Sequence, residues 1–237
     1  MLNFDLMGLG AIGVDVEKMV ARECKGEIEI PAILMKNPRA DRSLNKSIIT
    51  TDFNDFIKTK LDVIIEAAGH QTIQNYAVEI LRSGIDLLVT STGAFTDDKL
   101  YDDCIAAARG NGARLILPSA RIGSLDTLSA AAVGVLTSVH MIVRKDSSTW
   151  YGTHAEKLFD LSSLATPTVR FKETPREGVA FYPQNVNISA AVALAGLGLD
   201  KTKLAIIVDT QIDTHVCEIQ ETGAFGSYEF LENLTVA

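Results

Sequence analysis

The sequence has few of the residues that would indicate a secreted or metal-binding protein. Cysteine occurs only three times in 237 residues, at Cys24, Cys104 and Cys217. An odd number of widely spaced cysteines excludes a disulfide framework, and no CxxC pair is present to hold a metal. This usage is typical of a protein in a reducing compartment, so we expect a cytoplasmic location and no metal site.

Long apolar runs and a surplus of positive charge are also missing. The longest apolar run, 188–199, is far shorter than a membrane span, so no membrane contact is expected. The first residues lack the basic, apolar and cleavage regions of a signal peptide. The formal net charge is −8, which leaves no basic surplus to neutralise phosphates and argues against a nucleic-acid partner.

The composition is instead that of a globular protein with one or two domains, because 47% of the residues are hydrophobic and 22% are charged. In the first half, apolar β-rich runs alternate with helical stretches. Strands are expected at 4–7, 28–35, 62–68, 86–92 and 114–117, and helices at 11–24, 71–83 and 97–109, with a weaker helix at 52–59. This alternation predicts an α/β fold with a doubly wound parallel sheet.

The second half has a different pattern, which predicts a smaller α+β domain with a mostly antiparallel sheet. Helices are expected at 124–136 and 188–195, a capping box at 153–156, and strands at 140–144, 203–208, 215–221 and 227–230. We therefore predict one domain at 1–118 and a second at 119–237.

The segment GLGAIG places Gly8, Gly10 and Gly13 in a GxGxxG pattern between a predicted strand and a predicted helix. Gly8 permits the tight turn, Gly10 lets a pyrophosphate approach the backbone, and Gly13 lets the helix pack closely. The start of the helix, at Ala11 and Ile12, faces the anion. The context is the one that a dinucleotide-binding Rossmann motif requires.

The preference between NAD and NADP is left open by the end of the second strand. An acid there would accept a hydrogen bond from the ribose 2′-OH of NAD, but Lys36, Asn37, Arg39 and Arg42 follow instead. Cations suit the 2′-phosphate of NADP, and they are equally typical of a solvated loop.

Two further strand ends, EAAGH (66–70) and STGAF (91–95), carry small residues that would let a dinucleotide lie close. We predict cofactor contacts at Ala68, Ser91 and Thr92. His70 is a further candidate, although a solvent-facing cap on the next helix would explain it as well.

Ordered blocks across most of the chain resemble the L-aspartate dehydrogenase family. They include GLGAIG, the stretch from EAAGHQ to GAFTD, PSARIGSLDTLSAA, RKDSSTWYGTHAE, the stretch from PREGVAFYPQNVN to AIIVD, and GAFG. The resemblance implies a Rossmann domain joined to a substrate-binding and dimerisation domain, and hence a homodimer. It also implies NAD(P)-dependent oxidation of an amino acid substrate, L-aspartate, to iminoaspartate, which hydrolyses to oxaloacetate and ammonia or feeds NAD biosynthesis.

By position, the resemblance also implies binding residues in the second domain. The cofactor contacts would be Ala120, Arg121 and Asn187, and the substrate contacts Ser119, Arg121, Arg176 and Asn185. The residue types agree, since arginine suits a dicarboxylate and paired amides suit a carboxamide such as nicotinamide. The amides could also cap the following helix. Arg121 stands where the family has a small residue, so it could grip a substrate carboxylate, grip a cofactor phosphate or turn outward.

The strand DTHVCEI departs from the family's N-x-H-E-I, whose histidine is taken as catalytic. Aligned on the GAFG that follows, His215 falls on the asparagine position and Cys217 on the histidine position. The two share one face of the strand, with Cβ atoms roughly 6–7 Å apart. An imidazole suits the proton transfers of amine oxidation, whereas a thiol is a poorer base unless its pKa is perturbed.

Three hypotheses follow for the candidate catalytic residues His215 and Cys217. His215 takes over the role in a shifted pocket; the protein is a dehydrogenase or imine reductase for another small amino or imino acid; or it binds nucleotide with little turnover. Cys217 could equally be a buried, inert strand residue.

Overall fold

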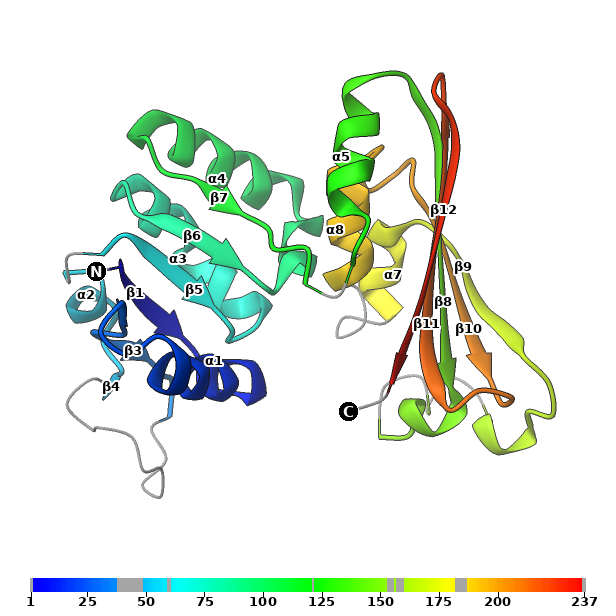
Figure 1. The fold of residues 1–237 in the computed structure, drawn as a ribbon, viewed down its shortest axis with the longest axis horizontal. Helices are drawn as coiled ribbons and strands as arrows, with labels where there is room; N and C mark the ends of the chain where they lie inside the picture. The colour runs from blue at the N-terminus through cyan, green and yellow to red at the C-terminus, as the bar shows by residue number, and fades with distance from the viewer. Residues whose placement is uncertain are drawn as a thin grey trace. The chain divides into compact units, whose positions relative to one another are not determined.

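The computed structural model describes residues 2–37, 49–58, 61–120, 122–152, 156, 160–181 and 187–235. The chain divides into two compact units, Met1–Pro118 and Ser119–Ala237, each of which is described by itself (Figure 1). Within the described residues, no helix has both the length and the apolar character needed to cross a bilayer.

The first unit is built on a parallel sheet. Its strands are β1 (Leu2–Met7), β2 (Ile28–Glu29), β3 (Ile33–Leu34), β4 (Ile49–Thr50), β5 (Val63–Glu66), β6 (Asp86–Val89) and β7 (Leu115–Ile116). Its helices are α1 (Ala11–Glu23), α2 (Phe53–Phe56), α3 (His70–Arg82), the 3-10 helix η2 (Thr92–Thr96) and α4 (Asp98–Asn111).

The strand order β4-β3-β1-β5-β6-β7, with β2 also paired to β1, confirms the predicted doubly wound sheet. All of these pairings are parallel. After β1 the chain adds β3 and then β4 on one side of that strand, and it later adds β5, β6 and β7 on the other side. Right-handed crossovers therefore place α1 and α3 on opposite faces, and the carboxyl ends of the strands meet at one edge.

The strand predicted at 28–35 is wrong as a single element, because it is divided into β2 and β3. Pro31 has no amide hydrogen to give to a ladder. The next amide, of Ala32, donates to the side-chain Oδ1 of the buried Asp5 at 2.7 Å. A side chain of β1 thus replaces a backbone partner and separates the two short strands.

The second unit is α+β, as predicted. Its strands are β8 (Leu136–Asp146), β9 (Thr168–Glu173), β10 (Lys203–Asp209), β11 (Thr214–Gly223) and β12 (Gly226–Thr235). Its helices are α5 (Leu125–Val133), η3 (Ser147–Trp150), η4 (Leu161–Ser163), α7 (Pro175–Phe181) and α8 (Asn187–Ala195). In the described residues the sheet has the order β12-β11-β8-β10-β9, with β8 and β10 parallel and the other pairs antiparallel.

Sequence patterns missed β9 and α7 and misjudged the boundary between α5 and β8. Helix α5 ends at Val133, short of the predicted residue 136, because Gly134 follows in an extended conformation. Strand β8 is longer than predicted because it pairs along its length with β11 and, in its second half, with β10. Of the predicted capping box at 153–156, only Glu156 lies within the described residues, where it accepts the N–H of Gly152.

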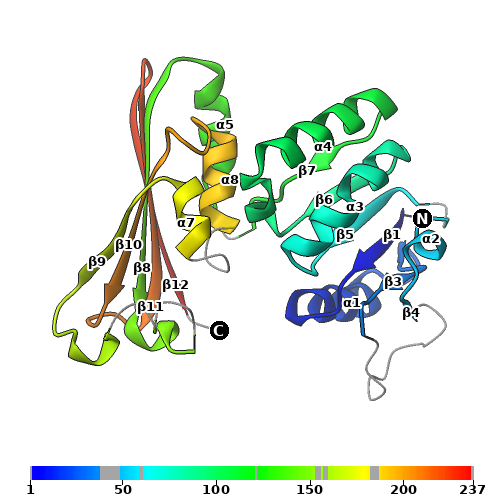
Figure 2. The same cartoon turned by 180° about the vertical axis from the view of Figure 1, so that it is seen from behind.

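Helices cover one face of the second sheet (Figures 1 and 2). Residues of α5 and α8, such as Leu128 and Val192, share a buried cluster with Met141, Ile206 and Ile219 of the sheet. Strand alternation turns the intervening residues to the opposite face, which no helix of the described part of this unit covers. We call the first the covered face and the second the open face.

Candidate functional site

The glycine-rich turn between β1 and α1 is shaped so that two of its glycines cannot carry a side chain. Gly8 has φ +91°, and a Cβ there would lie 2.7 Å from the carbonyl oxygen of Ala67. A Cβ on Gly13 would lie 2.3 Å from the carbonyl oxygen of Gly8. Both glycines are therefore required for the turn to pack against the helix and the neighbouring strand end.

Gly10 has the opposite surroundings, because a Cβ there would meet no atom within 4 Å. It is the N-cap of α1, with no side-chain cap and no acidic residue in the first turn of the helix. The N–H groups of a helix start carry partial positive charge and attract anions. The turn thus offers open space and hydrogen-bond donors in the place where the motif would receive a pyrophosphate.

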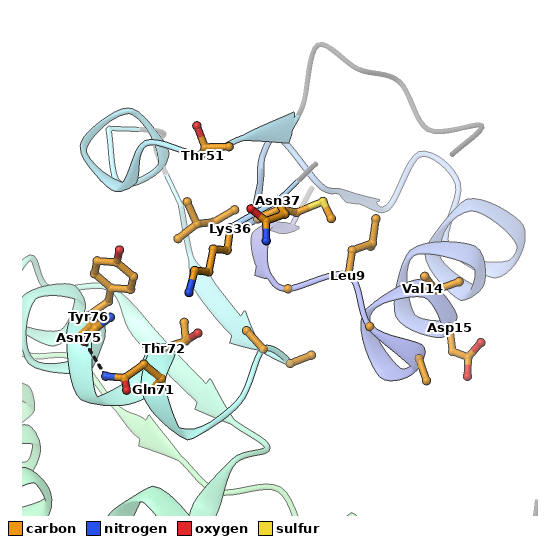
Figure 3. A pocket seen from close by; sticks show the side chains of 17 residues that line it. Leu9, Val14, Asp15, Lys36, Asn37, Thr51, Gln71, Thr72, Asn75 and Tyr76 are labelled. Atoms are coloured by element: carbon orange, nitrogen blue, oxygen red, sulfur yellow. Dashed lines mark hydrogen bonds between the residues drawn. The ribbon is translucent and has the colours of Figure 1, made fainter. Parts of the chain in front are cut away.

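A pocket of about 970 Å³ adjoins this turn (Figure 3). It is lined by Gly8, Leu9, Gly10, Ala11, Val14, Asp15, Leu34, Met35, Lys36, Asn37, Thr51, Ala67, Ala68, Gln71, Thr72, Asn75 and Tyr76. Lys36 extends from the end of β3 into the pocket, toward the side where Thr72 and Tyr76 of α3 lie. The glycine turn, the uncapped helix start and this cation together fit a phosphate-bearing dinucleotide.

The predicted cofactor residues are only partly brought together by this pocket. Gly8, Gly10, Ala11, Lys36 and Ala68 line it. Gly13 is buried behind the turn, and Ile12 is 54% exposed on α1. These two residues shape or flank the helix start and do not line the pocket.

The remaining first-unit candidates lie at the neighbouring strand ends. Ser91 and Thr92 are both buried. His70 is the first residue of α3, whose N-cap is Gly69, so His70 does not occupy the cap position. Arg39 and Arg42 lie outside the described residues.

Sequence reasoning missed Glu66, the fully buried last residue of β5. Its Oε1 accepts the N–H groups of Ala68 and Gly69, each at 2.7 Å, and the hydroxyl of Ser91 at 2.9 Å. Its Oε2 accepts the N–H of Ser91 at 3.0 Å. One carboxyl group therefore joins the loops after β5 and β6, the two strand ends predicted to meet the cofactor. The available signal was an acid at the end of an otherwise apolar strand.

We predict that Glu66→Gln raises the KM for the dinucleotide about tenfold and lowers kcat much less. A glutamine must point its NH2 group at one of these donors, and an unmet buried donor costs about 1–3 kcal/mol. The loop that presents Ala68 to the pocket should therefore shift. Steady-state kinetics would measure the effect, with Glu79→Gln on the exposed side of α3 as the matched control. A lower kcat at an unchanged cofactor KM would contradict this role.

In the second unit, the loop 119–124 contains a strained residue. Ala120 has φ +48°, the only positive φ of a non-glycine residue among those described. The left-handed region is unfavourable for a residue with a Cβ, and such strain is often found at functional sites. Ser119 closes the turn by accepting the N–H of Ile122 at 2.8 Å. Arg121 lies outside the described residues.

Arg176, predicted to bind substrate, is engaged by an acid of its own unit. Its Nε and Nη2 donate to the two carboxylate oxygens of Asp200 at 2.5 and 2.9 Å. This hydrogen bonding holds the pKa of Asp200 below its ordinary value. The paired guanidinium is a poorer substrate ligand than an uncommitted one. Asn187 is the half-buried first residue of α8, and Asn185 lies outside the described residues.

The candidate catalytic residues lie on β11, where Cys217 faces the covered side of the sheet. Cys217 is 6% exposed and belongs to the buried cluster of that side. Burial, together with the negative charges of Glu232 and Glu218, raises the pKa of its thiol to about 12. The thiol is therefore protonated at neutral pH and unsuited to act as a base or nucleophile. His215, two residues earlier on the same face, is half-buried.

Among the described residues, no group of three or more His, Cys, Asp or Glu side chains is arranged to hold a metal ion.

Comparisons with known proteins agree with the two-unit architecture. Residues 126–235 match the family model described as the C-terminal domain of aspartate dehydrogenase. Residues 8–118 match that of the NAD-binding domain of homoserine dehydrogenase.

Curated relatives extend this match to the whole chain. L-aspartate dehydrogenases of Cupriavidus necator and Pseudomonas aeruginosa are each 34% identical over 236 residues, covering 97% of this chain and 87% of the relative. The crystal structure of aspartate dehydrogenase from Thermotoga maritima has a TM-score of 0.78 at 22% identity, covering 98% of this chain and 88% of that one. At this identity, the structural match concerns the fold alone.

Proposed function

The chain belongs to the L-aspartate dehydrogenase family, and we propose on that premise that it oxidises L-aspartate with NAD or NADP. The product would be iminoaspartate, which hydrolyses to oxaloacetate and ammonia and could also feed NAD biosynthesis. The observation that carries the proposal is 34% identity to curated L-aspartate dehydrogenases across 97% of the chain. The cofactor pocket described above supports it independently.

The chain's own residues would divide the work between the two units. The turn 8–11 and Ala68 would hold the cofactor, which when bound supplies a hydride acceptor. His215 would accept a proton from the substrate ammonium group, because an imidazole exchanges protons near neutral pH. This frees the nitrogen lone pair that then forms the C=N bond. Cys217 takes no part as a base, because its thiol remains protonated.

We further propose that NADP is the preferred cofactor. Lys36 and Asn37 line the pocket directly after β3, where NAD-specific sites place a carboxylate on the ribose hydroxyl. The described lining contains one acid, Asp15, and it lies on α1 rather than at this strand end. A lysine there would pair with a 2′-phosphate.

A side-by-side assay of L-aspartate with NAD+ and NADP+ at alkaline pH tests both proposals. We expect turnover with both cofactors and a higher kcat/KM with NADP+. Lys36→Ala should lower kcat/KM for NADP+ about tenfold, as expected for a charge-assisted contact, and leave NAD+ nearly unchanged. Lys25→Ala, at an exposed position beyond α1, is the matched control. Absence of turnover with either cofactor would reject the activity, and a preference for NAD+ would reject the role of Lys36.

A second candidate function is dehydrogenation, or imine reduction, of another small amino or imino acid. It is favoured by the exchange at His215 and Cys217, since the residue predicted from the family at position 217 is a histidine. A panel of amino acids assayed with NADP+ would distinguish the two. Higher kcat/KM for an amino acid other than L-aspartate would support the second function.

We also infer a homodimer that forms through the open face of the second sheet. Leu231 of β12 is 69% exposed there and Val169 of β9 is 53% exposed, on a sheet face that no helix of the described part of this unit covers. Two such faces can pack against each other as in a β-sandwich.

We expect sedimentation analysis to give twice the subunit mass and Leu231→Lys to shift the protein toward monomer. Glu218 of β11 lies directly opposite Leu231, so a lysine at position 231 would face a carboxylate across the strands. Such a pair is favourable, and the substitution is therefore compatible with the folded subunit. Val133→Lys, at the 90% exposed end of α5, is the control. A monomeric wild-type protein would contradict the dimer.

A cytoplasmic location remains our proposal, supported by three cysteines that are all free thiols. Fractionation of cells that produce the protein, with recovery of activity outside the cytoplasmic fraction, would contradict it.

A further inference from the structure

Glu232 of β12 connects the loop 119–124 to the sheet. It lies directly opposite Cys217 in the β11–β12 register, on the covered side. Its Oε1 accepts the backbone N–H of Gly123, 109 residues away in the sequence. A Cβ on Gly123 would lie 3.1 Å from this oxygen, so a larger residue there would make the carboxylate shift by a few tenths of an ångström.

The second carboxylate oxygen of Glu232 is placed differently. Oε2 is buried, and it has no hydrogen-bond partner among the residues that the structure describes. Removing a carboxylate oxygen from water without a donor is unfavourable. Its neighbour Cys217 is only a weak donor. A ligand with an N–H group would supply the missing partner.

Glu232 also lies among the residues predicted to act on substrate. His215 pairs with Leu234, which places Glu232 diagonally across from His215. Diagonal neighbours of this kind lie about 7–8 Å apart, with their Cβ atoms somewhat closer. On its other side, Glu232 holds the loop that carries Ser119 and the strained Ala120. Ile122 of that loop belongs to the same buried cluster as Cys217.

We propose that Glu232 is a catalytic residue whose Oε2 accepts a hydrogen bond from the α-amino group of the substrate. The inference rests on the proposed function, because it needs an amino acid as the substrate. Its charge repels carboxylates, so the substrate amine is the group that it would receive.

The chemistry of amine oxidation gives this carboxylate a role in the transition state. The Cα–H bond breaks, and its electron pair leaves with the hydrogen as a hydride to NAD(P)+, which is thereby reduced. The nitrogen lone pair forms the C=N bond, and the nitrogen becomes positively charged. A fixed carboxylate beside it stabilises the charge that develops and does not itself gain or lose a proton.

The test compares two ligands that differ in the amino group. L-aspartate and succinate are titrated calorimetrically into wild-type protein and Glu232→Gln in the presence of NADPH, so that no oxidation of L-aspartate can occur. We expect Glu232→Gln to lower the affinity for L-aspartate at least tenfold. The affinity for succinate should stay the same or increase. The kcat for L-aspartate oxidation should fall about 100-fold, within the range of a lost transition-state contact.

Two further variants keep the test decisive. Glu232→Asp retains the charge and should recover part of the preference for L-aspartate over succinate, even if it also loosens the loop. Glu79→Gln, at an exposed position on α3 of the first unit, should change the affinity for neither ligand.

A parallel change in both affinities would overturn the proposal and assign Glu232 to holding the loop or to pairing with a cation such as Arg121. Failure of the proposed function would look different, because wild-type protein would then not oxidise L-aspartate. The comparison would in that case be repeated with the amino acid that is oxidised and its analogue without the amino group, and equal effects of Glu232→Gln on both would overturn the inference.

Discussion

Replacing Gly10 with valine should lower dinucleotide affinity about 100-fold while the free energy of unfolding changes by less than about 1 kcal/mol. A Cβ at this position meets no protein atom within 4 Å, and the backbone φ of −75° suits any residue. The side chain would instead fill the space in front of the start of α1. A pyrophosphate displaced from that position loses charge-assisted hydrogen bonds to the helix N–H groups.

Gly8→Ala is the informative contrast to Gly10→Val. At Gly8 the new Cβ would lie 2.7 Å from backbone atoms of the strand end after β5, at φ +91°. We expect this variant to lose about 2–4 kcal/mol of unfolding free energy as well as cofactor binding, because steric overlap and backbone strain add. Fluorescence titration with NADPH and chemical denaturation would separate the two effects. Unchanged NADPH affinity in a folded Gly10→Val protein would contradict the cofactor assignment.

Replacing His215 with alanine should lower kcat by about 100-fold or more, the usual loss when a general base is removed. Cys217→Ala should leave kcat within about threefold, because a thiol that stays protonated has no acid–base role to lose. Cys217→Ala should instead lower the free energy of unfolding by about 1 kcal/mol, because it leaves a small cavity in the buried cluster. Steady-state kinetics and thermal unfolding of both variants measure these effects.

The raised pKa of Cys217 also predicts a pH effect on stability. The folded protein holds the thiol proton up to about pH 12, whereas an ordinary exposed thiol releases it near pH 9.0. The folded state therefore binds more protons between these values, and this contribution to stability is complete below pH 9.0 and lost as the pH rises toward 12. Cys217→Ala should show less alkaline destabilisation than wild-type protein.

A double variant tests whether His215 or a histidine at position 217 serves the reaction better. The double variant His215→Asn with Cys217→His places the family's residues in the predicted family register. A rise in L-aspartate oxidation would mean that His215 does not serve in the wild-type pocket. A fall would mean that it does. The imidazole would also have to fit a position that is 6% exposed, so the thermal stability of the variant must be measured alongside its activity.

Local patterns were sufficient to predict the cofactor end of the molecule. The alternation of apolar strands and helices, with a glycine motif between β1 and α1, depends on neighbours in sequence, and the structure confirms the sheet and the turn. The α+β class of the second unit was predicted for the same reason. The division of β2 from β3 was not, because it depends on Asp5, 27 residues away from Ala32.

The sequence by itself thus determined the two folding patterns, the glycine turn and the family resemblance, because each rests on periodicity, steric limits of glycine or ordered blocks of residues. The tertiary structure alone decided which polar groups meet. Glu66 binds the loop after the next strand, Arg176 pairs with Asp200, and Glu232 reaches Gly123. It also decided that Cys217 stays protonated, because burial and neighbouring charges set a pKa, and both arise only when distant segments pack together.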